Sequence, residues 1–165
     1  MKALRDEFEI QHATLDDLPR VLDLWRQLME LTATHNDRYR LSPGAMKLQM
    51  SYLRSFMDST TAAIYIAKSD GLIVGFTDIY TTKPAPVFEQ KVLGVIENIY
   101  VLPEYRRLHI GEHLVHWARR FFENLRVGEI FVNVIPTNET SVVFWESMGF
   151  RTQKLSMTWK SPNLP

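Results

Sequence analysis

A short basic segment near the middle of the chain holds the residues best suited to binding chemistry. Arg106 and Arg107 come first, and Gly111 follows close to the point where a helix is expected to begin. The first backbone N–H groups of a helix have no internal acceptor, and the helix dipole adds partial positive charge there. Glycine also lets a ligand approach the backbone closely. Because cationic side chains flank these donors, the segment predicts a pocket for a phosphate or pyrophosphate.

The elements on either side place this segment between a strand and a helix. A strand is expected over residues 92–101, and Pro103 ends it because proline cannot donate a ladder hydrogen bond. An amphipathic helix is expected from Ile110 to about Arg126, since its apolar residues are spaced four and three apart. An apolar strand over residues 130–134 completes a β-α-β unit, whose two strands should be parallel.

Hydrophobic periodicity and turn residues predict the remaining elements. Thr14 and Asp16 are candidate N-caps of a first helix, and Ser42 with Pro43 should begin a second. The other expected strands cover residues 8–12, 62–68, 72–80 and 151–159, with a hairpin turn at 69–71, and the other expected helices end near residues 33, 58 and 149.

The composition excludes several classes of function. The chain has 165 residues, which suits one domain over residues 1–165. Its 19 basic and 19 acidic side chains give zero net charge, which argues against a nucleic-acid partner. The absence of cysteine excludes disulfides, thiolate metal sites and a cysteine nucleophile. Residues 1–8 lack the features of a signal peptide and no apolar run is long enough for a membrane span, so we expect a cytoplasmic protein without a membrane partner.

Two motifs together resemble a known family. Residues 106–111 read Arg-Arg-Leu-His-Ile-Gly, and residues 138–150 contain an asparagine, an aromatic pair and a final Gly-Phe. This is similar to the acyl-CoA signature of the GCN5-related N-acetyltransferases, whose core pattern is Gln/Arg-x-x-Gly-x-Gly/Ala. The resemblance covers nearly the whole chain and is strongest over residues 92–150. His109 stands where the family has its first glycine.

The resemblance implies a fold, a reaction and a co-substrate. The fold is α/β, with a mixed, largely antiparallel, twisted sheet of six to seven strands, a splayed parallel pair and about four covering helices. The reaction moves an acetyl group from acetyl-CoA to a primary amine of a small molecule or peptide, and no metal is implied. Because the chain has no cysteine, direct transfer in a ternary complex is the expected mechanism.

The resemblance also assigns CoA-binding roles. Backbone groups near residues 99–101 would pair with the pantetheine arm, and one N–H would hold the developing oxyanion. The amides of residues 108–112 would cradle the pyrophosphate. His109 either points outward and assists the phosphates or weakens binding, and we expect binding to be retained. The expected CoA-binding residues are Ile99, Tyr100, Val101, Arg106, Arg107, Leu108, His109, Ile110, Gly111, Glu112 and Asn138, the last of which has a helix N-cap as its alternative role.

Glu97 is the candidate general base, because an amine must lose a proton before it attacks the thioester. It is the acid expected inside an apolar strand, where burial would strengthen its carboxylate as a base. Strand alternation places it on the face opposite Asn98 and Tyr100. The alternative is that Glu97 faces solvent or makes a structural ion pair.

The proton donor to the departing thiolate is open. The family often has a tyrosine at the position of Trp145, whose indole cannot act as that acid. Tyr100, Tyr105 or water are the remaining candidates. His109 and Trp145 also favour the alternative of a non-catalytic acyl-CoA-binding or sensor protein. The loop over residues 35–41 is expected to line part of the acceptor cleft, and a homodimer is possible.

Overall fold

The computed structural model describes residues 7–87, 89 and 91–162, and its centre is a five-stranded sheet. The strands lie in chain order, from β1 to β5. The first three pairings are antiparallel and β4–β5 is parallel, which confirms the β-α-β prediction. The strands are β1 (Glu9–His12), β2 (Ala62–Ser69), β3 (Leu72–Thr82), β4 (Leu93–Val101) and β5 (Ile130–Val132).

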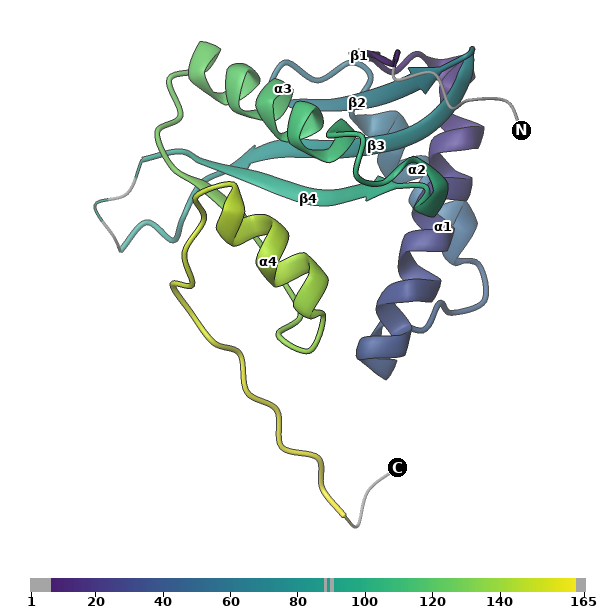
Figure 1. Cartoon of the computed structure of the whole chain (residues 1–165). Coiled ribbons are helices and arrows are strands. Elements are labelled where there is room, and N and C mark those ends of the chain that lie inside the picture. The colour runs from purple at the N-terminus through teal and green to yellow at the C-terminus, as the bar shows by residue number, and fades with distance from the viewer. Residues whose placement is uncertain (1–6, 88, 90, 163–165) are drawn as a thin grey trace. The chain divides into compact units, whose positions relative to one another are not determined.

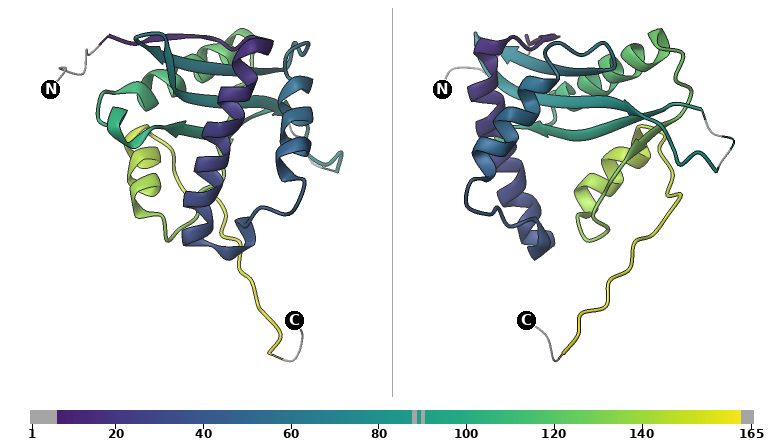
Figure 2. Two further views of the ribbon diagram at one scale, coloured as in Figure 1. Left: turned by 90° about the vertical axis from the view of Figure 1, so that its right-hand side faces the viewer. Right: turned by 180° about the vertical axis from the view of Figure 1, so that it is seen from behind.

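The chain divides into two compact units, one up to Asn133 and one from Val134 onward. In the first unit, α1 and α2 cover one face of the sheet and α3 covers the other (Figure 1). Figure 2 shows α1 and α2 side by side on their face. The second unit contains α4. The helices are α1 (Leu18–His35), α2 (Ala45–Ser55), α3 (Ile110–Asn124) and α4 (Glu139–Ser147).

Each face of the sheet has its own apolar core. On the α1/α2 face, fully buried Ile64, Ile66 and Phe76 pack with Leu24 and Leu53 of the helices. Burying side chains of this size removes a large apolar area from water and stabilises the fold. On the other face, α3 presents a buried apolar stripe whose members recur at intervals of three and four residues. It consists of Ile110, Leu114, Val115, Ala118 and Phe122.

A close contact between β4 and α3 explains one glycine. A β-carbon at Gly94 would lie 2.9 Å from ring atoms of Phe122, which is itself fully buried. Glycine therefore lets the aromatic ring lie directly against the strand.

A β-bulge interrupts β4 at Glu97. Asp78 pairs with Asn98, but the next residue of β3, Ile79, pairs with Ile96, so Glu97 is the extra residue. The bulge changes the alternation of the strand. Glu97 bonds to Tyr80 and Asn98 bonds to Asp78, two residues of β3 that alternate onto the same face. The expectation that Glu97 and Asn98 lie on opposite faces is therefore wrong.

The start of the second helix also differs from the prediction. It begins at Ala45 rather than at Ser42 and Pro43. Gly44 has φ = 85°, a left-handed conformation that a right-handed helix cannot include, and the amide of Ala45 closes a turn onto the carbonyl of Ser42.

Of the two N-cap candidates for the first helix, Thr14 does begin a short helical segment. The carboxylate of Asp17 accepts a hydrogen bond from the Thr14 amide there.

The expected last strand, 151–159, is wrong, and among the described residues the sheet has five strands rather than six or seven. This segment lies in the second unit, has no regular secondary structure and exposes Leu155, Met157 and Trp159 by 69 to 96%. Alternating hydrophobicity predicts a strand only if a ladder partner is available. The hairpin turn at 69–71 is confirmed, since Asp70 and Gly71 both have positive φ.

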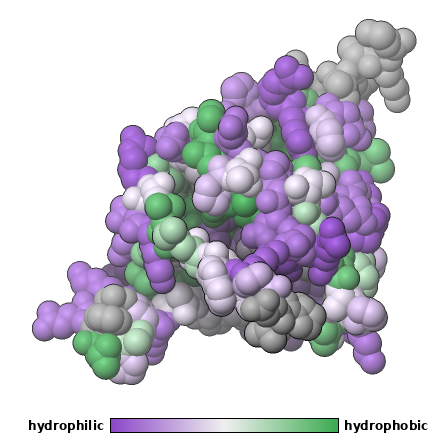
Figure 3. Space-filling model, turned by 90° about the horizontal axis from the view of Figure 1, so that it is seen from below, coloured by the Kyte–Doolittle hydropathy of each residue, from purple (hydrophilic) through white to green (hydrophobic). Residues whose placement is uncertain are grey.

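The surface is chemically mixed. On the face that Figure 3 shows, hydrophilic and hydrophobic residues are interleaved, as is common for folded proteins. Among the described residues, every helix is too short or too polar to cross a bilayer.

Candidate functional site

The loop between β4 and α3 has the backbone geometry that a phosphate site needs. Arg107 and His109 both adopt positive φ, 65° and 60°, and α3 begins at the next residue, Ile110. Histidine tolerates this conformation better than most residues, although glycine adopts it without strain. The left-handed turn thus explains why a glycine suits position 109, and it lies directly before the unpaired amides of the helix.

His109 points outward and does not fill the loop. Its side chain is 71% exposed, and Nδ1 lies 2.8 Å from Oε1 of Glu112 in the first turn of α3. When the imidazole is protonated, this ion pair compensates a carboxylate that would otherwise repel phosphate.

Arg106 is fixed by the end of β4. Its Nε donates to the carbonyl oxygen of Val101 at 3.0 Å, and its guanidinium carbon lies 5.5 Å from the ring centre of Tyr100. The hydrogen bond to Val101 uses one of the five guanidinium N–H donors. Arg106 therefore links the strand end to the loop, and the positive charge is positioned between them.

The edge of β4 that faces β5 is only partly paired. β5 pairs with Gly94–Ile96, and no described strand pairs with that edge from Glu97 to Val101. The backbone groups of Ile99 and the amide of Val101, whose carbonyl oxygen already accepts from Arg106, are therefore available for an extended ligand, as in β-strand addition. This open edge runs directly into the loop and the start of α3, so three predicted parts of the CoA site are contiguous in the chain.

The acids of the site lie at the bulge, on the face that α1 and α2 cover. Glu97 is exposed, so its predicted burial is wrong, and its Oε2 accepts a 3.3 Å hydrogen bond from Tyr80. The buried acid is instead Asp78 on β3, which is 0% exposed and accepts a 3.0 Å hydrogen bond from Asn98 Nδ2. The second carboxylate oxygen of Asp78, Oδ1, is buried without a hydrogen-bond partner.

Sequence reasoning missed Asp78, although a signal was available. The residue interrupts the apolar run of β3 just as Glu97 interrupts that of β4. An acid in a buried strand position carries a large desolvation cost, so such a residue usually has a partner or a function.

Burial dominates the electrostatics of this cluster. Desolvation raises the pKa of Asp78 from 3.8 to about 7, the hydrogen bond from Asn98 opposes the rise, and the nearby Glu97 charge adds to it. Burial, followed by the same two acids, raises the pKa of the Tyr52 phenol on α2. Burial and Glu97 also raise the pKa of Tyr80. The cluster therefore gathers negative charge suited to a cationic ligand.

Tyr100 is buried on the same face. Its hydroxyl donates to Oε1 of Gln27 on α1 at 3.4 Å, and its ring is 7% exposed. Its role as a proton donor stays a prediction, as does that of Tyr105, which is partly exposed.

The second unit positions two further residues of interest. Asn138 caps α4, since its Oδ1 accepts from the amide of Ser141 at 3.2 Å, and its predicted contact with CoA stays a prediction. Trp145 is 6% exposed and packs edge-on against Phe144 and Phe150, with ring centres 5.1 and 4.9 Å away. This packing accounts for an aromatic residue at position 145 without a catalytic role.

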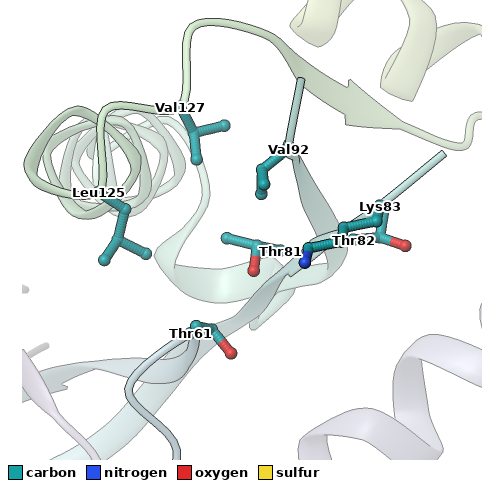
Figure 4. A pocket seen from close by; sticks show the side chains of 7 residues that line it. All are labelled: Thr61, Thr81, Thr82, Lys83, Val92, Leu125 and Val127. Atoms are coloured by element: carbon teal, nitrogen blue, oxygen red, sulfur yellow. The ribbon is translucent and has the colours of Figure 1, made fainter. Parts of the chain in front are cut away.

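A surface hollow of about 370 Å³ lies away from these residues. Its lining comes from the residue before β2, the end of β3 with the residue that follows it, the residue before β4 and the segment after α3 (Figure 4). The basic loop, in contrast, follows β4 and precedes α3. The hollow is therefore at the opposite end of both elements. Within the described part of the chain, no three His, Asp or Glu side chains gather as metal ligands would.

Comparison with known proteins agrees with this geometry. Residues 23–150 match the profile of the acetyltransferase (GNAT) family. Over 137 residues the chain is 29% identical to aminoglycoside N(6′)-acetyltransferase type 1 of Salmonella typhimurium, covering 78% of this chain and 84% of that protein. An uncharacterised N-acetyltransferase of Archaeoglobus fulgidus is 30% identical over 103 residues, covering 61% and 68% of the two chains.

Solved structures extend the likeness to the fold. The aminoglycoside N-acetyltransferase AAC(6′)-Iy, solved in complex with CoA, aligns with a TM-score of 0.74 and 20% identity, over 94% of this chain and 95% of that one.

Proposed function

Because the chain belongs to the acetyltransferase (GNAT) family and is an acetyl-CoA-dependent N-acetyltransferase, we propose that its acceptor is a small molecule with several amines, of the aminoglycoside class. The observation that carries this proposal is the acidic cluster at the bulge, where Glu97 and Asp78 share the α1/α2 face. Cationic amines complement such a cluster. The name of the Salmonella relative supports the same class of acceptor.

The donor site combines a loop and a strand edge. The amides of residues 108–112 hold the pyrophosphate of acetyl-CoA, with the helix dipole and Arg107 adding positive potential. The open edge of β4 at residues 99–101 receives the pantetheine arm. An N–H group of this edge polarises the thioester carbonyl and stabilises the oxyanion that forms during attack.

Glu97 accepts the proton that the acceptor must lose. One N–H bond of the acceptor ammonium breaks, a bond to the Glu97 carboxylate forms, and the neutral nitrogen attacks the carbonyl carbon. The C–S bond then breaks, the nitrogen loses its second proton to become an amide, and the CoA thiolate gains a proton in exchange, relayed by Tyr100, Tyr105 or water. Exposure of Glu97 at the bulge suits this role, because the acceptor can reach it directly.

A thiol-release assay with acetyl-CoA tests the proposal. The acceptors are sisomicin, hexylamine as a simple amine, and a peptide with a free N-terminus. We expect kcat/KM for sisomicin to exceed that for hexylamine by at least about 100-fold, or about 2.7 kcal/mol, because several charges are recognised together. Preference for the peptide would contradict the acceptor class, and CoA binding without turnover of any amine would instead favour a non-catalytic acyl-CoA-binding protein.

A further inference from the structure

Asp78 is the most deeply buried charged group in the described part of the chain, and neither CoA binding nor the proton transfer to Glu97 requires it. We propose that Asp78 is a positioning residue for acetyl transfer: a buried proton-binding carboxyl that is coupled to Glu97 across the bulge and sets the charge that the acceptor amine meets. This inference rests on the proposed function and assigns a second acid to the same site.

The hydrogen bonding of Asp78 leaves its charge state finely balanced. Oδ2 accepts from Asn98, while Oδ1 is buried and unpaired. A buried carboxylate is costly when one of its oxygens lacks a hydrogen-bond partner, because that oxygen has lost its water. Protonation removes the charge, but the carboxyl O–H then needs an acceptor of its own. Neither state is fully satisfied, so a nearby charge can shift the balance.

Three titratable groups interact electrostatically with Asp78. Glu97 approaches from β4, Tyr80 from β3 itself and Tyr52 from α2. The negative charge of Glu97 raises the pKa of Asp78, so that the carboxyl is near half-ionised at neutral pH. The bulge brings the two acids to one face, since without the extra residue only one of Glu97 and Asn98 would reach it.

The coupling has a definite direction. An acceptor ammonium beside Glu97 cancels the repulsion, so Asp78 releases its proton to solvent more readily. The ionised Asp78 then attracts the ammonium and favours proton uptake by Glu97. Binding of a cationic acceptor should therefore release a proton, and raising the pH through 7 should strengthen the reaction by the same route.

A direct titration tests the coupling without any acceptor. The carboxyl carbon of Asp78 is followed by NMR in the wild type, in Glu97→Gln and in the surface control Asp58→Asn. We expect a midpoint near 7 in the wild type and the control, and a lower midpoint in Glu97→Gln, which loses the neighbouring charge. A midpoint near 4 in the wild type, or no shift in Glu97→Gln, overturns the inference whatever the enzyme turns over.

The pH dependence of kcat/KM tests whether the charge of Asp78 affects catalysis. We expect kcat/KM for sisomicin to rise several-fold through pH 7 in the wild type and Asp58→Asn, and this rise to disappear in Asp78→Asn. In Asn98→Ala the rise should move to higher pH, because the hydrogen bond that lowers the pKa of Asp78 is lost. The amines of sisomicin titrate equally in all variants, so the ratio of wild type to variant isolates the protein group.

The outcomes separate the two claims. An unchanged profile in both Asp78→Asn and Asn98→Ala overturns the inference while leaving the proposed function intact. If Asp78→Asn does not fold, Asn98→Ala decides. If the wild type turns over no amine, the proposed function fails, and the inference fails with it even where the NMR titration shows coupled acids.

Discussion

Glu97 and Asp78 lie on neighbouring strands, yet water reaches one carboxylate and not the other. This difference assigns them different tasks. The exposed acid can meet an acceptor and exchange a proton with it, whereas the buried acid can act only through its field. An acid and its environment, rather than the acid alone, thus determine what each residue does.

Replacing the exposed acid tests its role as the base. In Glu97→Gln we expect kcat to fall by about 10² to 10⁴-fold, since a positioned general base contributes about that much. The KM for acetyl-CoA should stay within about two-fold, because the donor site does not use this carboxylate. Steady-state kinetics with the matched surface variant Glu123→Gln as control would measure both. A kcat within three-fold of the wild type would exclude Glu97 as the base.

Asp78 should make the protein less stable as the pH rises. The folded state keeps its proton up to about pH 7, while the unfolded chain loses it near 3.8. The free energy of unfolding should therefore fall between about pH 4 and 7, by up to about 4 kcal/mol, and stay low above 7. Asp78→Asn should remove this slope, whereas Asp58→Asn should keep it. Urea unfolding at pH 5 and pH 8 would show the difference, and parallel slopes in the wild type and Asp78→Asn would refute it.

At the level of elements, the turn before α3 carries strain that its sequence could avoid. His109 holds φ = 60°, which glycine adopts at about 1 kcal/mol lower cost. In His109→Gly we expect a melting temperature higher by a few degrees and a KM for acetyl-CoA lower by several-fold, because the backbone can approach phosphate more closely. Calorimetry and steady-state kinetics would check this. Glu112→Gln, which breaks the same side-chain pair without changing the turn, should not reproduce the gain.

The contact between β4 and α3 is equally sensitive. Gly94→Ala would place a β-carbon 2.9 Å from the Phe122 ring, and overpacking of this kind costs about 1–3 kcal/mol. The control is Gly128→Ala, where a β-carbon meets nothing within 4 Å. Chemical denaturation should separate the two variants. Equal stability would mean that the ring moves aside freely.

The sequence predicts the helices and strands of the first unit because each has a local cause. The stripe of α3 and the hairpin residues Asp70 and Gly71 depend only on near neighbours, so their pattern is sufficient. The bulge depends on pairing between β3 and β4, and no local pattern marks which residue is extra. The face of Glu97 follows from that pairing, so the sequence pattern alone could not predict it, whereas the break that Asp78 makes in the apolar run of β3 was a local signal. The strand predicted over residues 151–159 is wrong for a similar reason, since a strand needs a pairing partner that the local sequence does not reveal.

At the level of the whole molecule, the exposed apolar residues of the second unit bear on assembly. Leu155, Met157 and Trp159 alternate along an extended segment and are strongly exposed. Contiguous exposed apolar side chains often mark an interface, and homodimers are the commonest assemblies. We therefore predict a homodimer, and a triple substitution of these residues by serine should yield a monomer. Light scattering of both proteins at matched concentration would test this, and a monomeric wild type would refute it.

The cytoplasmic location and the single-domain organisation also stay predictions.

The extra residue in β4 shifts the alternation of its side chains by one position. Before it, odd-numbered side chains such as Val95 point toward α1 and α2; after it, even-numbered ones such as Tyr100 do so. Deleting Glu97 would remove the bulge without turning either half of the strand over, because Ile96 and Asn98 already pair with the consecutive residues Ile79 and Asp78. Such a deletion would therefore remove the exposed acid and the bulge while leaving the other side chains of β4 on the faces that they occupy now.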